Sequence, residues 1–202
     1  MSASDNIDAL EMEKHSTNIY LKKLSPERWN DLVTLFETSA QCKECWCMNH
    51  RLPPKDEITG TKAKDALQDL TSKNKIYGVL AYSGDKCVGW CSVDPLKTQP
   101  GHDYCLESKD IDNKNIWSIH CIYLHPSFRG QGISKKLIQE AVEVAKSSGA
   151  SQVLAFPIPE ENKAKFSEHD DEFSGRFSTF IKLGFEKKNQ LNDFYQVVSK
   201  NL

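Results

Sequence analysis

The sequence predicts a single α/β domain whose β-sheet mixes antiparallel and parallel strand pairs and is flanked by helices. Residues 75–95 have the pattern of two strands joined by the turn Ser83-Gly84-Asp85, which predicts an antiparallel hairpin. Residues 115–157 have the pattern of a strand, a glycine turn, an amphipathic helix and a second strand. That order is a βαβ unit, whose two strands are parallel. The length of 202 residues, 39% of them hydrophobic, suits one core.

Before the hairpin we expect a polar leader, a strand and two helices. The leader covers residues 1–18, and the single domain then covers residues 19–202. Residues 18–24 alternate like a strand, and residues 25–40 predict a helix with Ser25 as N-cap and Pro26 in the first turn. The apolar face of this helix would comprise Trp29, Leu32, Val33 and Phe36. A more polar helix is predicted over residues 61–72.

After the hairpin, residues 96–115 have no sustained period and predict a long surface connection. A strand follows over 115–126, then a helix that begins after Gly132 and ends before Gly149. Its buried face is predicted to comprise Leu137, Ile138, Ala141, Val142 and Ala145. A strand over 151–157, a charged connection, a helix near 174–183 and a strand near 193–199 complete the domain.

Charge and cysteine content narrow the functional class. The net charge is −2 and Lys and Arg are spread along the chain, which argues against a nucleic-acid partner. No apolar stretch approaches the roughly 20 residues of a membrane-spanning helix, and the acidic N-terminal segment is unlike a secretory signal. We therefore expect a cytoplasmic protein without a membrane partner, either a monomer or a homodimer. Seven cysteines cannot all pair, and those in strand-like segments are predicted to be free thiols: Cys87, Cys91, Cys105 and Cys121.

The turn Arg129-Gly130-Gln131-Gly132 separates the strand from the best amphipathic helix of the chain. The first amides of a helix have no intrahelical partner and carry partial positive charge, so they favour a phosphate. Arg129, Lys135 and Lys136 would add positive charge. The alternative is that the glycines serve only the backbone angles of the turn. The patterns GxxxxGK[ST] and GxGxxG are both absent.

Residues 129–134 resemble the [Q/R]-x-x-G-x-[G/A] signature of the GNAT superfamily of acetyl-CoA-dependent N-acetyltransferases, with Ser134 departing from the usual Gly or Ala. Residues 124–150 are similar to the strand, loop and helix at the centre of that fold, and residues 180–188 to its closing helix-to-strand element. The stretches "CWCM", "VGWCSVDP" and "IWSIHCIYLHPSFRGQG" also resemble a bacterial subgroup whose members mostly lack an assigned substrate.

The resemblance implies a GNAT fold with a mostly antiparallel sheet, in which the strands at 115–126 and 151–157 form a parallel pair that splays at a bulge. Acetyl-CoA would be the co-substrate. Its pantetheine arm would bind the backbone of Ile122, Tyr123 and Leu124. Its pyrophosphate would bind Arg129, Gly130, Gln131, Gly132, Ile133, Ser134 and Lys135.

The implied reaction transfers an acetyl group to a primary amine of a small molecule, or of a protein lysine or N-terminus, by direct attack in a ternary complex. The alternative is a non-catalytic acyl-CoA sensor.

His120 stands where the family often has a carboxylate base, and a histidine with a pKa near ~6.5 suits that task. The alternative is a histidine that only bonds within the sheet. In a regular strand Cys121 points to the opposite face, so an acyl-cysteine is not expected. Phe180 replaces the tyrosine that usually protonates the CoA thiolate. Ser178, Thr179, Tyr123 or water would then take that role.

The stretch "CKECWCMNH" contains Cys42, Cys45, Cys47 and His50, which could formally bind zinc. Cys-x-Cys spacing is unusual for such a site and no second cysteine pair follows, so we expect no metal and apolar packing instead. The resemblance places this region beside the acceptor pocket and makes substrate contacts of Trp46, Met48, His50 and Arg51, unless they are core residues.

Residues 159–173 are strongly acidic and would favour a cationic amine if they line the acceptor mouth. A solvated loop is the alternative. The residues concerned are Glu160, Glu161, Glu168, Asp170, Asp171 and Glu172.

Overall fold

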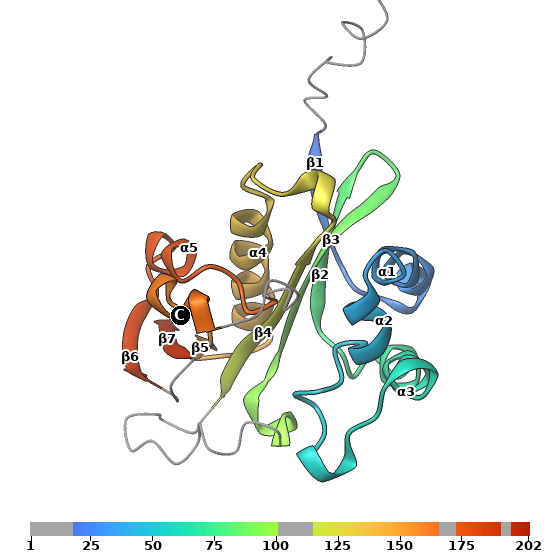
Figure 1. Cartoon of the computed structure of the whole chain (residues 1–202), viewed down its shortest axis with the longest axis horizontal. Helices are drawn as coiled ribbons and strands as arrows, with labels where there is room; N and C mark the ends of the chain where they lie inside the picture. Colours follow the sequence, from blue (N-terminus) through green and yellow to red (C-terminus); the bar gives the residue numbers. More distant parts are fainter. Residues whose placement is uncertain (1–17, 101–114, 166–172, 191–194) are drawn as a thin grey trace, which may run out of the picture.

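The computed structural model describes residues 18–100, 115–165, 173–190 and 195–202. Its strands form one seven-stranded sheet in the order β1-β2-β3-β4-β5-β7-β6 (Figure 1). Only β4 and β5 are parallel among these neighbouring pairs, which confirms the predicted mixed sheet. The strands are β1 Ile19–Lys23, β2 Gly78–Ser83, β3 Lys86–Pro95, β4 Ile116–Leu124, β5 Gln152–Ala155, β6 Glu186–Gln190 and β7 Gln196–Asn201.

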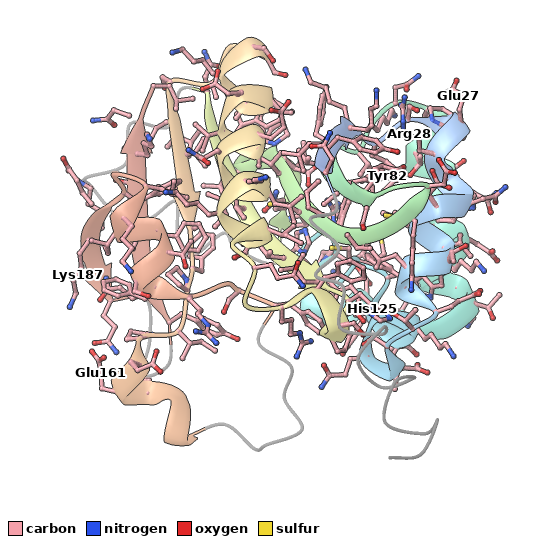
Figure 2. All side chains as sticks on the ribbon, turned by 90° about the horizontal axis from the view of Figure 1, so that it is seen from above. Glu27, Arg28, Tyr82, His125, Glu161 and Lys187 are labelled. Atoms are coloured by element: carbon pink, nitrogen blue, oxygen red, sulfur yellow. The ribbon has the colours of Figure 1, made fainter. Side chains whose placement is uncertain are left out.

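Helices cover both faces of the sheet (Figure 1). α4 (Ile133–Ser147) packs on one face, and α5 (Phe177–Lys182) lies on the same side. The opposite face carries α1 (Trp29–Phe36), α2 (Ala40–Cys45) and α3 (Gly60–Ser72), which bury a second apolar cluster against β2, β3 and β4. Figure 2 shows Tyr82 of β2 close to Arg28, which immediately precedes α1, while Lys187 of β6 lies at the far side of the molecule.

The predicted helices are present, with differences in their first turns and boundaries. All of the residues predicted for the buried face of α4 are buried, and Gly149 follows the helix with a φ of +87°. The first helix begins as a 3-10 turn over Pro26–Arg28, and the Ser25 side chain makes no capping hydrogen bond. Leu35 is buried in α1, whereas Val33 is only half-buried. The separate short helix α2 was not predicted; Ser39 caps it by accepting from the Cys42 amide at 3.2 Å.

A β-bulge interrupts β4 at His120 and Cys121. On β3 the paired positions advance by two residues, from Cys91 to Val93, while on β4 they advance by three, from Ile122 to Ile119. The extra residue changes the alternation of side chains: Ile119 lies in the α4 cluster and Cys121 in the α1–α3 cluster. The prediction that Cys121 points away from His120 is therefore wrong, because both side chains contact the segment that follows α2.

β4 and β5 separate after a short parallel ladder. Their pairing runs from Ile116–Gln152 to Ile119–Ala155, so β4 continues beyond the last pair without β5 beside it. In this splay the amide of Ile122 donates a hydrogen bond of 2.6 Å to the carbonyl of Phe173. His120 lies where the separation begins.

Among the helices of the described residues, none has the length and apolar character that crossing a membrane requires. Cys105 and most of the predicted connection 96–115 lie outside the described residues. So do the leader up to residue 17 and the acidic residues Glu168, Asp170, Asp171 and Glu172.

Candidate active site

The turn between β4 and α4 presents a row of backbone amides to solvent. Gly130 and Gly132 have φ values of +77° and +75°, a conformation that glycine adopts without strain. Successive amides in such a turn form an anion-binding concavity. Within the ranges that the structure describes, the N–H groups of residues 130–134 meet no protein acceptor. A Cβ atom at Gly130 or Gly132 would meet nothing within 4 Å, so a ligand has open access to this backbone.

Positive charge surrounds this turn. The exposed side chain of Arg129 donates from Nε to the carbonyl of Leu124 at 3.3 Å, and exposed Lys135 and Lys136 occupy the first turn of α4. Partial burial, followed by the charges of Lys86 and Arg129, lowers the pKa of His125. With the N-terminus of a 15-residue helix at its centre, the turn has the donors and the charge to hold a pyrophosphate.

The turn lies at the end of the strand that carries His120. The His120 ring stacks against His50, with centroids 4.6 Å apart, and against Phe156 at 4.9 Å. Its Nε2 lies 2.8 Å from Ser118 Oγ, which donates in turn to Gln99 Oε1 at 2.9 Å. His120 itself is only half-buried, whereas Ser118 and Gln99 are 0% and 1% exposed. A partly accessible imidazole is thus held by a buried polar chain.

A buried ion pair holds the segment after α2 against β3. Arg51 pairs with Asp94 and also donates to the carbonyl of Cys47 and, at 3.2 Å, to Ser92 Oγ. Asp94 accepts the amide of Tyr77 at 3.0 Å as well. Burial raises the pKa of the Asp94 carboxyl, and the Arg51 charge acts against it. This pair fixes the loop from which His50 reaches His120.

A thiol lies beside the same ion pair. Cys47 is 3% exposed, and its Sγ accepts from Trp90 Nε1 at 3.3 Å. Burial disfavours its thiolate, but the hydrogen bond with Cys121 and the charge of Arg51 outweigh burial and lower the pKa of Cys47 to about 7. Burial raises the pKa of Cys45 to about 11. Wherever the structure describes side chains, no three His, Cys, Asp or Glu residues are grouped so that they could hold a metal.

The residues predicted to contact the acceptor mostly make internal contacts. Trp46 and Met48 are 3% and 2% exposed, and the Trp46 ring packs on Phe36 with centroids 5.5 Å apart. The guanidinium of Arg51 is buried in its ion pair. His50 reaches the neighbourhood of His120, and a substrate role for any of these residues stays a prediction.

The candidates for protonating the thiolate lie on two elements, Tyr123 on β4 and both Ser178 and Thr179 on α5. Tyr123 is 1% exposed and its hydroxyl lies 2.9 Å from Thr38 Oγ1; because Thr38 donates to the carbonyl of Leu35, the tyrosine is the donor in this contact. Ser178 is exposed on α5. Phe180, at the position of the expected tyrosine, is fully buried against Phe185.

Three functional neighbours were missed from sequence: Ser118, Gln99 and Asp94. Gln99 falls in the segment interpreted as a surface connection, and the other two look like ordinary strand residues. For Ser118 and Asp94 the one available signal was polarity inside a hydrophobic stretch, since a buried polar side chain needs a partner. Gln99 lies in a polar stretch and gave no such signal.

Known proteins share both the sequence pattern and the fold. The model of the Acetyltransferase (GNAT) family matches residues 40–165. An uncharacterized N-acetyltransferase of Methanocaldococcus jannaschii is 29% identical over 96 residues, which are 48% of this chain and 37% of that relative. The chain thus spans little more than a third of that protein's length.

Solved structures share the fold at low sequence identity. The GNAT domain of PAT from S. lividans aligns with a TM-score of 0.57 at 14% identity, covering 90% of this chain and 89% of that one. The yncA protein of Salmonella typhimurium, solved with its cofactor acetyl-CoA, gives 0.56 at 13% identity, covering 91% and 94%. The family model covers more than half of this chain, and the fold agrees with it: this chain belongs to the GNAT family of acetyltransferases.

Proposed function

We propose that this protein transfers the acetyl group of acetyl-CoA to a primary amine of a small molecule, by direct attack within a ternary complex. One observation carries the proposal: an open row of backbone amides, flanked by positively charged side chains, lies at the start of α4 and follows the strand that holds His120. An anion site and a candidate base would thereby lie on consecutive elements of the fold, the start of α4 and the strand β4. Such placement can supply several kcal/mol of a typical barrier.

The amides of residues 130–134 would hold the pyrophosphate, assisted by Arg129 and Lys135. The backbone of Ile122 to Leu124 would hold the pantetheine arm along the splay. Because the Ile122 amide already donates to Phe173, this bond must be exchanged on binding. Acetyl-CoA supplies an activated thioester, so the chain itself needs only to orient the acceptor and move protons.

His120 would accept a proton from the acceptor amine as the new C–N bond forms and the C–S bond breaks. A neutral imidazole is suited to this near neutral pH. Tyr123 is hydrogen-bonded to Thr38 and Phe180 has no hydroxyl, so we assign protonation of the leaving thiolate to water. The charges of exposed Glu160 and Glu161, in the turn that begins five residues after β5, would favour a cationic acceptor if this turn lines the acceptor mouth.

A second candidate function is an acyl-CoA sensor without turnover. Phe180 in the core and the occupied amide of Ile122 favour it. Both functions require the loop, and only the enzyme requires His120.

The test is release of free thiol from acetyl-CoA over a panel of primary amines and peptides with lysine or free N-termini, with calorimetry of acetyl-CoA binding. We expect at least one amine to accelerate thiol release, and Gly132→Glu to abolish both signals by placing a carboxylate in the cradle. Gly149→Glu is the matched control, because Gly149 also has positive φ and open space but lies at the other end of α4.

Binding without amine-dependent release would favour the sensor. Absence of binding to the wild-type chain would refute both functions.

A further inference from the structure

We infer that Gln99 and Ser118 hold the proton of neutral His120 on Nε2, so that Nδ1 is the nitrogen that takes the proton from the acceptor amine. The second half rests on the proposed function. The first half stands on the hydrogen bonds alone. Ser118 and Gln99 are positioning residues in this scheme, and His120 alone meets the reacting amine.

The side-chain carboxamide of Gln99 sets the direction of the hydrogen bonds that lead to His120. Pro95 and the 3-10 turn Leu96–Thr98 fold the polypeptide back, and the backbone N–H of Gln99 donates to the carbonyl of Leu96 at 3.0 Å. Gln99 is thereby buried, at 1% exposure. Gln99 Nε2 lies 3.4 Å from the carbonyl of Asp94. A carbonyl can only accept, so the NH₂ group must face Asp94 and Oε1 must face Ser118.

The hydroxyl of Ser118 transmits that direction. Its single proton goes to Gln99 Oε1 at 2.9 Å, which leaves a lone pair toward His120 Nε2 at 2.8 Å. The ring nitrogen in this contact must therefore be the donor. A neutral imidazole has one N–H, so the basic lone pair is on Nδ1.

The surroundings keep this arrangement rigid. Ser118 is cross-strand from Asp94, whose carboxylate is bound by Arg51 and by the Tyr77 amide. The His120 ring stacks with interplanar angles of 18° on His50 and 19° on Phe156, which opposes a ring flip. The bulge places His120 at the splay while its partner Ser118 remains within the regular part of β4.

The tautomer can be measured without any substrate. We would record long-range ¹H–¹⁵N spectra of the full chain with ¹⁵N-labelled histidine, above the pH at which His120 titrates, and assign His120 from the His120→Asn spectrum. We expect the Nε2–H form in the wild type. In Gln99→Met the Ser118 proton loses its acceptor and can turn to His120, so the ring should shift toward Nδ1–H. Ser118→Ala should give a mixture of both forms.

A wild-type Nδ1–H tautomer would overturn the inference, as would a tautomer unchanged in both variants. Ser199→Ala is the matched control, because Ser199 is a buried serine on β7, outside this chain of hydrogen bonds. It should leave the His120 spectrum as in the wild type.

Steady-state kinetics test the second part of the inference, that Nδ1 of His120 takes the proton from the acceptor amine. We expect Ser118→Ala to lower kcat by about tenfold or more, part of the roughly 10²–10⁴-fold that a general base contributes, with the KM for acetyl-CoA unchanged. Ser118→Thr retains the hydroxyl and should recover most of the loss. Gln99→Met nearly preserves the size of the side chain, and its kcat should fall in parallel with its tautomer shift.

If the tautomer is as inferred but kcat does not follow it, the positioning role fails. If His120→Asn itself leaves turnover intact, the proposed base fails while the hydrogen-bond assignment stands.

Discussion

The anion cradle that follows β4 and the surroundings of His120 within β4 are built in opposite ways. Beyond Leu124 the anion cradle consists of exposed backbone amides and two glycines in open space. At His120 the site depends on two buried side chains: Ser118 contacts the imidazole, and Gln99, oriented by the backbone carbonyl of Asp94, orients Ser118. A site made of backbone depends on a helix end and tolerates changes of nearby side chains. A site made of buried side chains loses its geometry when any single member is replaced.

The largest expected effect is on kcat, from a substitution at His120. His120→Asn removes the base while leaving the cradle intact, so kcat should fall by about 10²- to 10⁴-fold with little change in acetyl-CoA affinity. Steady-state kinetics and calorimetry would measure the two quantities. His125→Asn, at the cradle end, should leave kcat within a few-fold of wild type. Full turnover in His120→Asn would exclude this histidine as the base.

The buried ion pair should govern stability. Arg51→Met leaves the Asp94 carboxylate buried without its counter-charge, so the free energy of unfolding should fall by about 3–5 kcal/mol. Urea denaturation would measure it. The exposed pair between Lys64 and Glu37, with atoms 3.2 Å apart, gives the control: Lys64→Met should cost less than about 1 kcal/mol. Equal losses in both variants would contradict a special role for the buried pair.

The Cys47 thiol should make stability depend on pH. Its folded pKa of about 7 lies below the ordinary value of 9.0, so between these values the unfolded chain binds more protons than the folded one. Stability should therefore rise with pH from about 7 toward 9, and the gain should disappear as pH falls through 7.

Under reducing conditions Cys47→Ala should flatten this rise in urea midpoints. Cys91→Ala should retain it, because burial raises the pKa of Cys91 and its thiol stays protonated throughout. An unchanged slope in Cys47→Ala would show that the thiolate is not stabilised.

The smallest effect is expected on acetyl-CoA affinity, from a substitution at Arg129 beside the cradle. Arg129 is exposed, so Arg129→Gln should weaken acetyl-CoA binding by no more than about 1 kcal/mol, and the difference should shrink as salt is added. Calorimetry at two ionic strengths would measure it. Lys146→Gln, in the last turn of the same helix, should have no effect. A loss as large as that of Gly132→Glu would mean that side chains, and not amides, dominate the cradle.

Particular elements show why some predictions from sequence succeeded. The hairpin around Gly84, the parallel unit around α4 and the buried face of that helix follow from local periodicity and turn residues, and all are present. The bulge was not derivable from alternation, because Ile116–Leu124 has buried apolar residues on both faces and therefore lacks a clear polar–apolar period. α2 was missed because six residues contain too few turns for a periodic signal.

By itself, the sequence determined the class of fold, the family resemblance and the position of the glycine turn, since each depends on residues close together along the chain. Only the tertiary structure decided which polar residues meet His120. Ser118 and His50 contact His120, and Gln99 reaches it through Ser118; the three come from a strand, a loop and a turn. Their contact depends on strand register and on a bulge, which are set by packing across the whole sheet.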